Sequence, residues 1–217
     1  LFKFNVFSEL ATNPMVYFGK ENWMFYIGEN VKEIYENKRL YTEEELKKMT
    51  RHLEERRNWL NAQGISYYIL FPRMSHYFYQ EKVGAGLYQY VKKPRLEQFV
   101  EYLSKHSTVK VIDVSAPMFK AKQENSRDLY YRSDSHWNLF GAYFAYEAVI
   151  KYIQKDHPTI KPAIPLKEIK WIEDESQEAD LSKLISLSGY ITRHEYLPLH
   201  ADVNSSELLP SPNYPEY

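Results

Sequence analysis

Hydrophobic positions change spacing several times along the first part of the chain. Two short β-prone runs at residues 15–18 and 23–27 flank a glycine-containing turn, which predicts a β-hairpin. Thr42 and Glu45 then form a capping box, and apolar residues at helical spacing predict a helix over 42–63. Its buried stripe is expected to consist of Leu46, Met49, Leu53, Trp59 and Leu60.

Two helix–strand units follow from this pattern. Residues 65–71 form a short apolar run behind the helix-stopping Gly64, and residues 109–114 form a second run behind an amphipathic helix at 96–103. Such units predict an α/β fold in which a mostly parallel sheet is flanked by helices. The aromatic, irregular stretch 73–90 follows the C-terminal end of the first strand, where open α/β sheets place their ligands.

One long helix dominates the second part of the chain. We expect a loop at 115–133 and then a helix from Trp137 or Asn138 to about Gln154. Its buried side should carry Phe140, Phe144, Ala148 and Tyr152. Behind it the pattern predicts three short features, namely a strand at 169–172, a helix at 181–187 and an irregular tail from 198 onward.

Asp134 and His136 form an Asp-x-His pair between the expected loop and this helix. Side chains two positions apart share one face of an extended segment. A carboxylate beside an imidazole can accept its Nδ1 proton and leave Nε2 free as a general base. The pair could equally bind a metal or form a surface hydrogen bond without chemistry. The neighbouring Ser133 and Ser135 are expected to be turn-forming hydroxyls.

Composition narrows the class of protein. A chain of 217 residues with 44% apolar residues suits one domain with a real core. A net charge of −1 gives no reason to expect a nucleic acid as partner, and the lack of cysteine excludes disulfides and cysteine-based zinc sites. We expect no metal and no cofactor. No apolar run reaches the roughly 18 residues of a transmembrane helix. The 20 tyrosines and 4 tryptophans could stack on sugar rings or simply pack.

Four stretches, in this order, resemble the polysaccharide O-acetyltransferases of the alginate acetylation type, whose catalytic domain is SGNH hydrolase-like. They are the Gly-Lys-Glu-Asn-Trp hairpin at 18–26, the strand that ends at Pro72, the Asp-x-His-Trp signature at 131–138 with Gly141 and Ala142 behind it, and the Asp-Leu-x-x-Leu turn at 180–184. The resemblance covers most of the chain and implies one SGNH hydrolase-like domain over 1–217.

The resemblance also implies a function. A Ser-His-Asp triad would move an acetyl group onto a sugar hydroxyl of an extracytoplasmic or cell-surface polysaccharide, with Asp134 orienting the imidazole and His136 as the base. The acetyl donor would be passed on by a membrane acyltransferase. The domain would act in the periplasm or at the cell surface, exported or anchored by a segment outside this chain. An acetyl-esterase of the same fold and a non-catalytic glycan-binding or assembly module are the alternatives.

The chain departs from the family pattern at the nucleophile. In the family the serine follows the Asp–His pair, in a Gly-Asp-Ser-like turn behind a buried strand, but neither Gly-Asp-Ser nor Arg-Asp-Ser occurs here. Ser188 precedes a glycine, yet no apolar strand leads into it. We therefore expect the nucleophile beyond Tyr217, in a C-terminal part that this chain lacks.

The resemblance also suggests which residues bind substrate. Where the family has a lysine shortly after the strand-ending proline, this chain has Arg73, which could supply similar charge. We expect Arg73, His76, Tyr131 and Trp137 to contact substrate. His76 is expected in an exposed loop, and Trp137 could serve either as a packing residue under the site or as a sugar platform.

Overall fold

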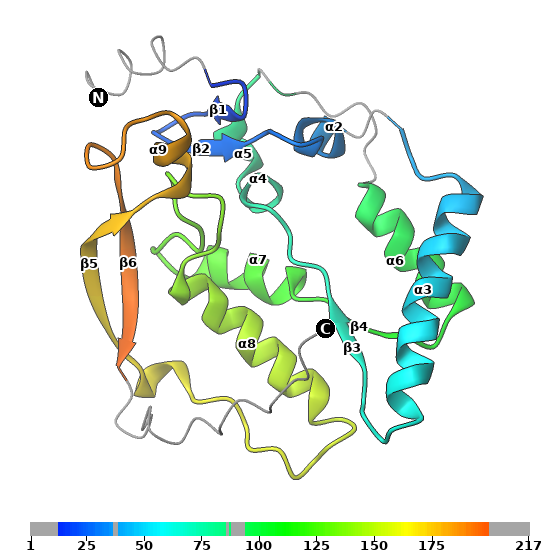
Figure 1. Ribbon diagram of the computed structural model, residues 1–217. Helices are drawn as coiled ribbons and strands as arrows, with labels where there is room; N and C mark the ends of the chain where they lie inside the picture. Colours follow the sequence, from blue (N-terminus) through cyan, green and yellow to red (C-terminus); the bar gives the residue numbers. More distant parts are fainter. Residues whose placement is uncertain (1–12, 37–38, 86, 88–93, 200–217) are drawn as a thin grey trace, which may run out of the picture.

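A pair of parallel strands lies at the centre of the fold, with helices on both of its faces (Figure 1). The strands are β3 (Tyr68–Leu70) and β4 (Lys110–Ile112), with Ile69 opposite Val111. The computed structural model describes residues 13–36, 39–85, 87 and 94–199. The parallel pairing predicted from the two helix–strand units is confirmed, although each strand is shorter than its apolar run.

One face of the strand pair packs against α3 (Glu43–Asn61) and α6 (Arg95–His106). Ile69 and Val111 join the core cluster that Leu46 of α3 forms with apolar residues of α6. Successive strand residues point to opposite faces, so the neighbouring positions must be buried elsewhere.

The opposite face is covered by α7 (Ser115–Glu124) and α8 (Leu139–Ile153). Leu70 and Ile112 belong here to the largest core cluster, together with Met118 of α7. Figure 1 shows α7 and α8 on this side of the strands and the hairpin of β5 and β6 beyond α8.

The helix α7 contradicts the loop expected at 115–133. Its apolar residues do not form a clear stripe, and Pro117 lies in its first turn, where proline is tolerated. Met118 and Ala121, one turn apart, are nonetheless buried. Packing against the strands, rather than an amphipathic pattern, stabilises this helix.

The start of α3 follows its sequence signals. The Thr42 hydroxyl accepts a hydrogen bond from the Glu45 N–H, and the Glu45 carboxylate accepts one from the Thr42 N–H, which confirms the capping box. The prediction that Trp59 is buried is wrong, because its side chain is 65% exposed. At about 100° per residue, Trp59 lies nearly half a turn away from the stripe that starts at Leu46.

Two antiparallel hairpins complete the described strands. The predicted N-terminal hairpin is confirmed as β1 (Val16–Phe18) and β2 (Met24–Tyr26). The second hairpin joins β5 (Lys170–Glu178) and β6 (Thr192–Leu199) and extends far beyond the strand expected at 169–172. Both of its strands are rich in polar residues, so they lack the apolar run that would have predicted them. Parallel pairing is thus confirmed for β3 and β4 alone.

Short helices connect these parts. The predicted helix at 181–187 is present as α9 (Asp180–Leu184), and the expected long helix as α8. The other helices are α2 (Val31–Glu36), α4 (Ser75–Phe78), α5 (Gln80–Val83) and the 3-10 helix η1 (Leu166–Glu168). Most of the tail expected from residue 198 lies outside the described residues.

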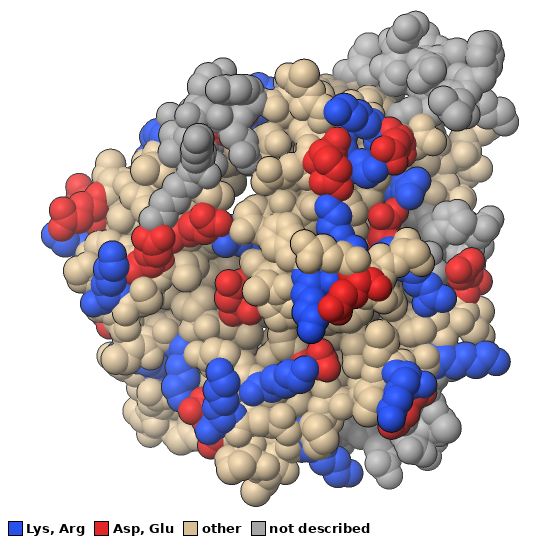
Figure 2. Space-filling view, turned by 180° about the vertical axis from the view of Figure 1, so that it is seen from behind, with Lys and Arg blue, Asp and Glu red and all other residues tan. Residues whose placement is uncertain are grey.

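Charged side chains of both signs are interspersed over the face shown in Figure 2. This distribution agrees with the near-zero net charge of the sequence. Within the described ranges, no helix combines the length and the apolar character needed to cross a membrane.

The closest approach of α8 to the preceding chain depends on Gly141. A Cβ atom at this position would overlap the carbonyl oxygen of Leu129, which is backbone and cannot rotate away. We expect Gly141→Ala to lower the free energy of unfolding by about 2 kcal/mol, as overpacking does. Urea denaturation measures this change. Lys151→Ala, on the exposed side of the same helix, is the control and should stay within about 0.5 kcal/mol of wild type. An equally small effect of Gly141→Ala would contradict the close approach.

Candidate active site

Residues 129–138, here called the site segment, double back on themselves. Tyr130 and Trp137 form an antiparallel bridge, and the Asn138 N–H donates to the Leu129 carbonyl at 3.1 Å. The segment is therefore a tight loop and not the extended stretch expected from the sequence. The two functional side chains still meet, because the His136 N–H donates to Asp134 Oδ1 at 3.1 Å within the turn.

Two distant parts of the chain and the start of α8 hold the site segment. The Met24 N–H at the start of β2 donates to the Arg132 carbonyl at 2.7 Å, and the Ser133 hydroxyl donates to the Thr192 carbonyl at 3.1 Å. Asn138 caps α8 by accepting a hydrogen bond from the Gly141 N–H at 2.7 Å. The Ser133 hydroxyl thus bonds a distant carbonyl, so the prediction that it forms a local turn is wrong.

Two buried tyrosines fix the start of the segment. The Leu129 N–H donates to the Tyr79 hydroxyl at 2.7 Å, and the Tyr130 hydroxyl donates to the Arg73 carbonyl at 2.6 Å. Burial raises the pKa of both phenols, so both stay protonated at neutral pH. Because Arg73 follows β3, the segment contacts the chain just beyond the C-terminal end of that strand.

Asp134 and His136 form a buried acid next to an exposed imidazole. The Asp134 side chain is 2% exposed and that of His136 is 71% exposed. Asp134 Oδ1 lies 2.8 Å from His136 Nδ1, a hydrogen bond that requires the proton on Nδ1. Nε2 has no hydrogen-bond partner among the described residues, so its lone pair is available to a substrate or a nucleophile.

Asp180 and Ser135 complete this cluster, and the sequence did not indicate their roles. The Asp180 N–H donates to Asp134 Oδ2 at 3.0 Å. The Asp180 carboxylate accepts the Ser135 N–H at 2.8 Å and also the Ser135 hydroxyl, and it lies 3.5 Å from His136 Nδ1. Asp180 belongs to the Asp-Leu-x-x-Leu motif that resembles the family. The sequence did not show, however, that the fold places this motif next to the site segment.

The cluster contains the ligand types of a metal site. One ligand atom each from Asp134, His136 and Asp180 lies within 4.8 Å of the others. In this arrangement the carboxylates are already used as acceptors for N–H and O–H groups, and the shortest contact to the imidazole is a hydrogen bond. The geometry therefore favours proton transfer as the chemistry of the cluster.

No serine in the described part of the chain is placed as a nucleophile for His136. The Ser135 hydroxyl lies 3.3 Å from Nδ1, the nitrogen that Asp134 already engages. Ser188 is exposed in the turn before β6, and no strand leads into it. Another Ser–His contact joins Ser66 to His157 at 3.0 Å, but Ser66 lies before the N-terminal end of β3.

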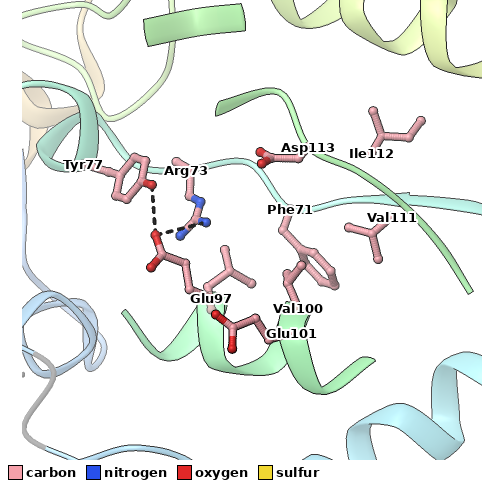
Figure 3. Close-up of a pocket in the computed structure, with 10 residues that line it drawn as sticks. Phe71, Arg73, Tyr77, Glu97, Val100, Glu101, Val111, Ile112 and Asp113 are labelled. Carbon is pink, nitrogen blue, oxygen red and sulfur yellow. Dashed lines mark hydrogen bonds and ion pairs between the residues drawn. The ribbon is translucent and has the colours of Figure 1, made fainter. Parts of the chain in front are cut away.

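Arg73 lines a cavity of about 270 Å³ at the C-terminal ends of β3 and β4 (Figure 3). Its guanidinium lies over the Tyr77 ring, 4.4 Å from the ring centre, and 3.7 Å from a carboxylate oxygen of Glu97. The Tyr77 hydroxyl donates to the same oxygen at 3.0 Å. Among the described residues, no contact joins the Arg73 side chain to Asp134 or His136.

The expectation that His76 lies in an exposed loop is wrong. His76 belongs to α4, is 8% exposed and packs edge-on against the Tyr35 ring at a centre-to-centre distance of 4.5 Å. Burial without a nearby carboxylate lowers the pKa of the imidazole to about 4. A neutral, buried ring offers little surface to a substrate. We therefore no longer consider His76 a candidate substrate-binding residue.

Tyr131 is buried and Trp137 is partly buried, so both rings pack against the protein. Tyr131 is 6% exposed, and Trp137 packs against the main core with its ring centre 6.4 Å from that of Tyr130. The packing role considered for Trp137 is the one that the structure supports. Tyr131 also lines an open pocket of about 780 Å³ between the site segment and the turn before β6, where Tyr190 is 78% exposed.

The sequence of the chain matches a known protein family. The family described as "SGNH hydrolase-like domain, acetyltransferase AlgX" matches residues 16–209. No curated protein matches the chain.

Several solved structures share the fold. They include the O-acetyltransferase domain of Pseudomonas putida AlgJ (18% identity, TM-score 0.57, covering 85% of this chain and 66% of that one), Bacillus cereus PatB1 with a sulfonyl adduct (15%, 0.51, 84% and 56%) and Pseudomonas aeruginosa AlgX (14%, 0.53, 84% and 43%). The chain spans less than two thirds of the length of each. At these identities the likeness shows the fold.

Buried His76 makes stability depend on pH. Its pKa is about 4 in the folded chain and about 6.5 when unfolded, so the unfolded state binds the extra proton between these values. The unfolding free energy is therefore not affected by the protonation of His76 above about pH 6.5, and it decreases as the pH falls from there toward 4. Over that window, wild type should lose about 3 kcal/mol more unfolding free energy than His76→Gln.

Urea denaturation at several pH values measures this difference. His52→Gln, which removes an exposed histidine on α3, is the matched control and should behave like wild type. Parallel pH curves for wild type and His76→Gln would show that the buried imidazole titrates normally.

Proposed function

The chain belongs to the family of SGNH hydrolase-like acetyltransferase domains exemplified by AlgX, as its sequence predicted, and we propose that it transfers acetyl groups to the hydroxyls of a polysaccharide. The AlgJ structure is named as an O-acetyltransferase domain, which supports this class of reaction. There are two alternatives, namely acetyl-ester hydrolysis by the same residues and glycan binding without catalysis. The experiment below distinguishes them from acetyl transfer.

The observation that carries the proposal is the state of the His136 ring. Asp134 accepts the Nδ1 proton at 2.8 Å and is itself almost inaccessible to water. The ring is therefore held in the tautomer whose Nε2 lone pair is free, and the side chain is 71% exposed. This is the arrangement of a general base that works on a group brought to it from outside.

In the first half of the proposed reaction, a serine hydroxyl attacks the carbonyl carbon of the acetyl donor. His136 Nε2 takes the hydroxyl proton as the Oγ–C bond forms. The imidazolium that results is stabilised by the Asp134 carboxylate. When the tetrahedral intermediate breaks down, Nε2 returns the proton to the leaving group of the donor, and an acetyl-serine ester remains.

In the second half, a sugar hydroxyl attacks this ester. His136 Nε2 takes the proton of the sugar hydroxyl as the new C–O bond forms, and then gives it to the departing serine oxygen. Water in place of the sugar would give acetate, so transfer and hydrolysis differ only in which hydroxyl reaches Nε2. The exposed imidazole leaves room for a large acceptor.

The other parts of the proposal follow from the family. The acceptor is a polysaccharide of the cell envelope, the site of action is extracytoplasmic, and a membrane acyltransferase passes on the acetyl donor. The nucleophilic serine is expected beyond Tyr217. Arg73 remains a candidate substrate-binding residue because its cavity lies where parallel strands end.

The test uses the intact protein that contains these residues, with an activated chromogenic acetyl ester as donor and an oligosaccharide as acceptor. His136→Ala should abolish acetyl transfer. Asp134→Asn should lower kcat by about 10⁴, because the wrong tautomer is then favoured. Glu55→Gln is the matched control, because it removes the charge of an exposed carboxylate on α3 that pairs with Arg51, and it should keep near-normal turnover.

Mass spectrometry of the products separates the alternatives. Acetylated sugar indicates a transferase, acetate alone an esterase, and neither a binding module. Labelling by a fluorophosphonate should depend on His136, and residues 1–217 alone should not be labelled. Labelling that Ser66→Ala abolishes and His136→Ala leaves intact would place the reactive serine at the Ser66–His157 contact and overturn the proposal.

A further inference from the structure

Asp180 contacts both members of the Asp134–His136 pair. Its N–H donates to Asp134 Oδ2 at 3.0 Å, and its carboxylate lies 3.5 Å from His136 Nδ1. We propose that Asp180 is a positioning residue that supports Asp134 in keeping the proton of His136 on Nδ1. The proposal rests on the role of His136 as a general base.

Three oxygen atoms surround His136 Nδ1. Asp134 Oδ1 lies at 2.8 Å, Ser135 Oγ at 3.3 Å and Asp180 Oδ2 at 3.5 Å. The two ionised carboxylates can only accept hydrogen bonds. The Ser135 hydroxyl is different, because it has a proton that it could donate to Nδ1.

The proton of the Ser135 hydroxyl is directed away from His136. The Ser135 hydroxyl donates to the Asp180 carboxylate, which also accepts the Ser135 N–H at 2.8 Å. A hydroxyl has one proton, so this bond prevents Ser135 from donating to His136. Nδ1 therefore faces acceptors on all three sides and must carry the proton itself. The Nε2 lone pair is left free for catalysis.

If the Asp180 carboxylate is removed, the Ser135 proton becomes available. The hydroxyl, 3.3 Å from Nδ1, can then donate to that nitrogen in competition with Asp134 Oδ1 at 2.8 Å, and a fraction of the rings would carry the proton on Nε2. In this tautomer the ring cannot take a proton from a serine or a sugar. Asp180 thus acts through Ser135, without touching the substrate.

Asp180 also contacts the Asp134 carboxylate through its backbone. A buried carboxylate needs donors, and the Asp180 N–H supplies one to Oδ2 while Oδ1 faces His136. Asp180 is the first residue of α9, where the N–H has no partner within the helix. This bond holds Oδ2, while Oδ1 lies 2.8 Å from Nδ1.

The test is the ¹⁵N NMR spectrum of the His136 ring in residues 1–217, recorded in alkaline buffer where histidine is neutral. Wild type should show a protonated Nδ1. Asp180→Ala should shift the ring toward protonation on Nε2. Ser135→Ala alone should keep the wild-type pattern, and it should restore that pattern when added to Asp180→Ala, because the competing hydroxyl is then gone.

The control is Glu178→Ala, which removes an exposed carboxylate two residues away that pairs with Lys183 at 2.6 Å. It should leave the His136 spectrum unchanged. An unchanged Nδ1–H form in folded Asp180→Ala would overturn the proposal. So would a shifted tautomer that Ser135→Ala fails to restore, because the effect would then reflect general disorder of the loop.

Activity in the intact protein provides a second readout. Asp180→Asn and Asp180→Ala should lower kcat on the order of 10-fold with little change in KM, as loss of supporting partners does. Ser135→Ala should recover part of the loss. The NMR result needs no turnover, so an absence of acetyl transfer would count against the proposed function and leave the tautomer result to be judged alone.

Discussion

The Asp134 carboxylate is removed from water, and a charge in such a place needs hydrogen-bond donors from the protein. Its donors come from different parts of the chain, because the His136 N–H lies in the same turn while the Asp180 N–H lies at the start of α9. The site therefore requires that α9 and the site segment be held together. The hairpin of β1 and β2 does this, since Met24 packs against α9 and also donates to the Arg132 carbonyl.

This arrangement combines a fixed acid with an open base. The Asp134 side chain is 2% exposed, whereas that of His136 is 71% exposed. The precision of the pair thus comes from the fold, and the reacting groups have to be brought to it. A polymeric acceptor requires such openness, because only one of its many hydroxyls has to enter while the rest of the chain stays outside.

The sequence predicted the features that depend on neighbours in the chain. The Thr42 capping box, the Asn138 start of α8 and the Asp134–His136 pair are all local, and all are present. Features that depend on distant packing were missed. Asp180 meets the site through the folding of α9, and His76 is buried because Tyr35 from α2 covers it. The strands β5 and β6 pair through backbone hydrogen bonds, and their polar sequences do not predict strands.

Trp23 has a consequence for spectroscopy. Its indole is fully buried and stacks on the Tyr79 ring at 4.2 Å, and the Tyr79 hydroxyl accepts the Leu129 N–H from which the site segment starts. Its near-ultraviolet circular dichroism should thus be strong and sensitive to movements of the segment. Exposed Trp59 should contribute mainly long-wavelength fluorescence that acrylamide quenches readily. Trp23 is thus an optical reporter that is connected to the site segment through the Tyr79 ring and one hydrogen bond.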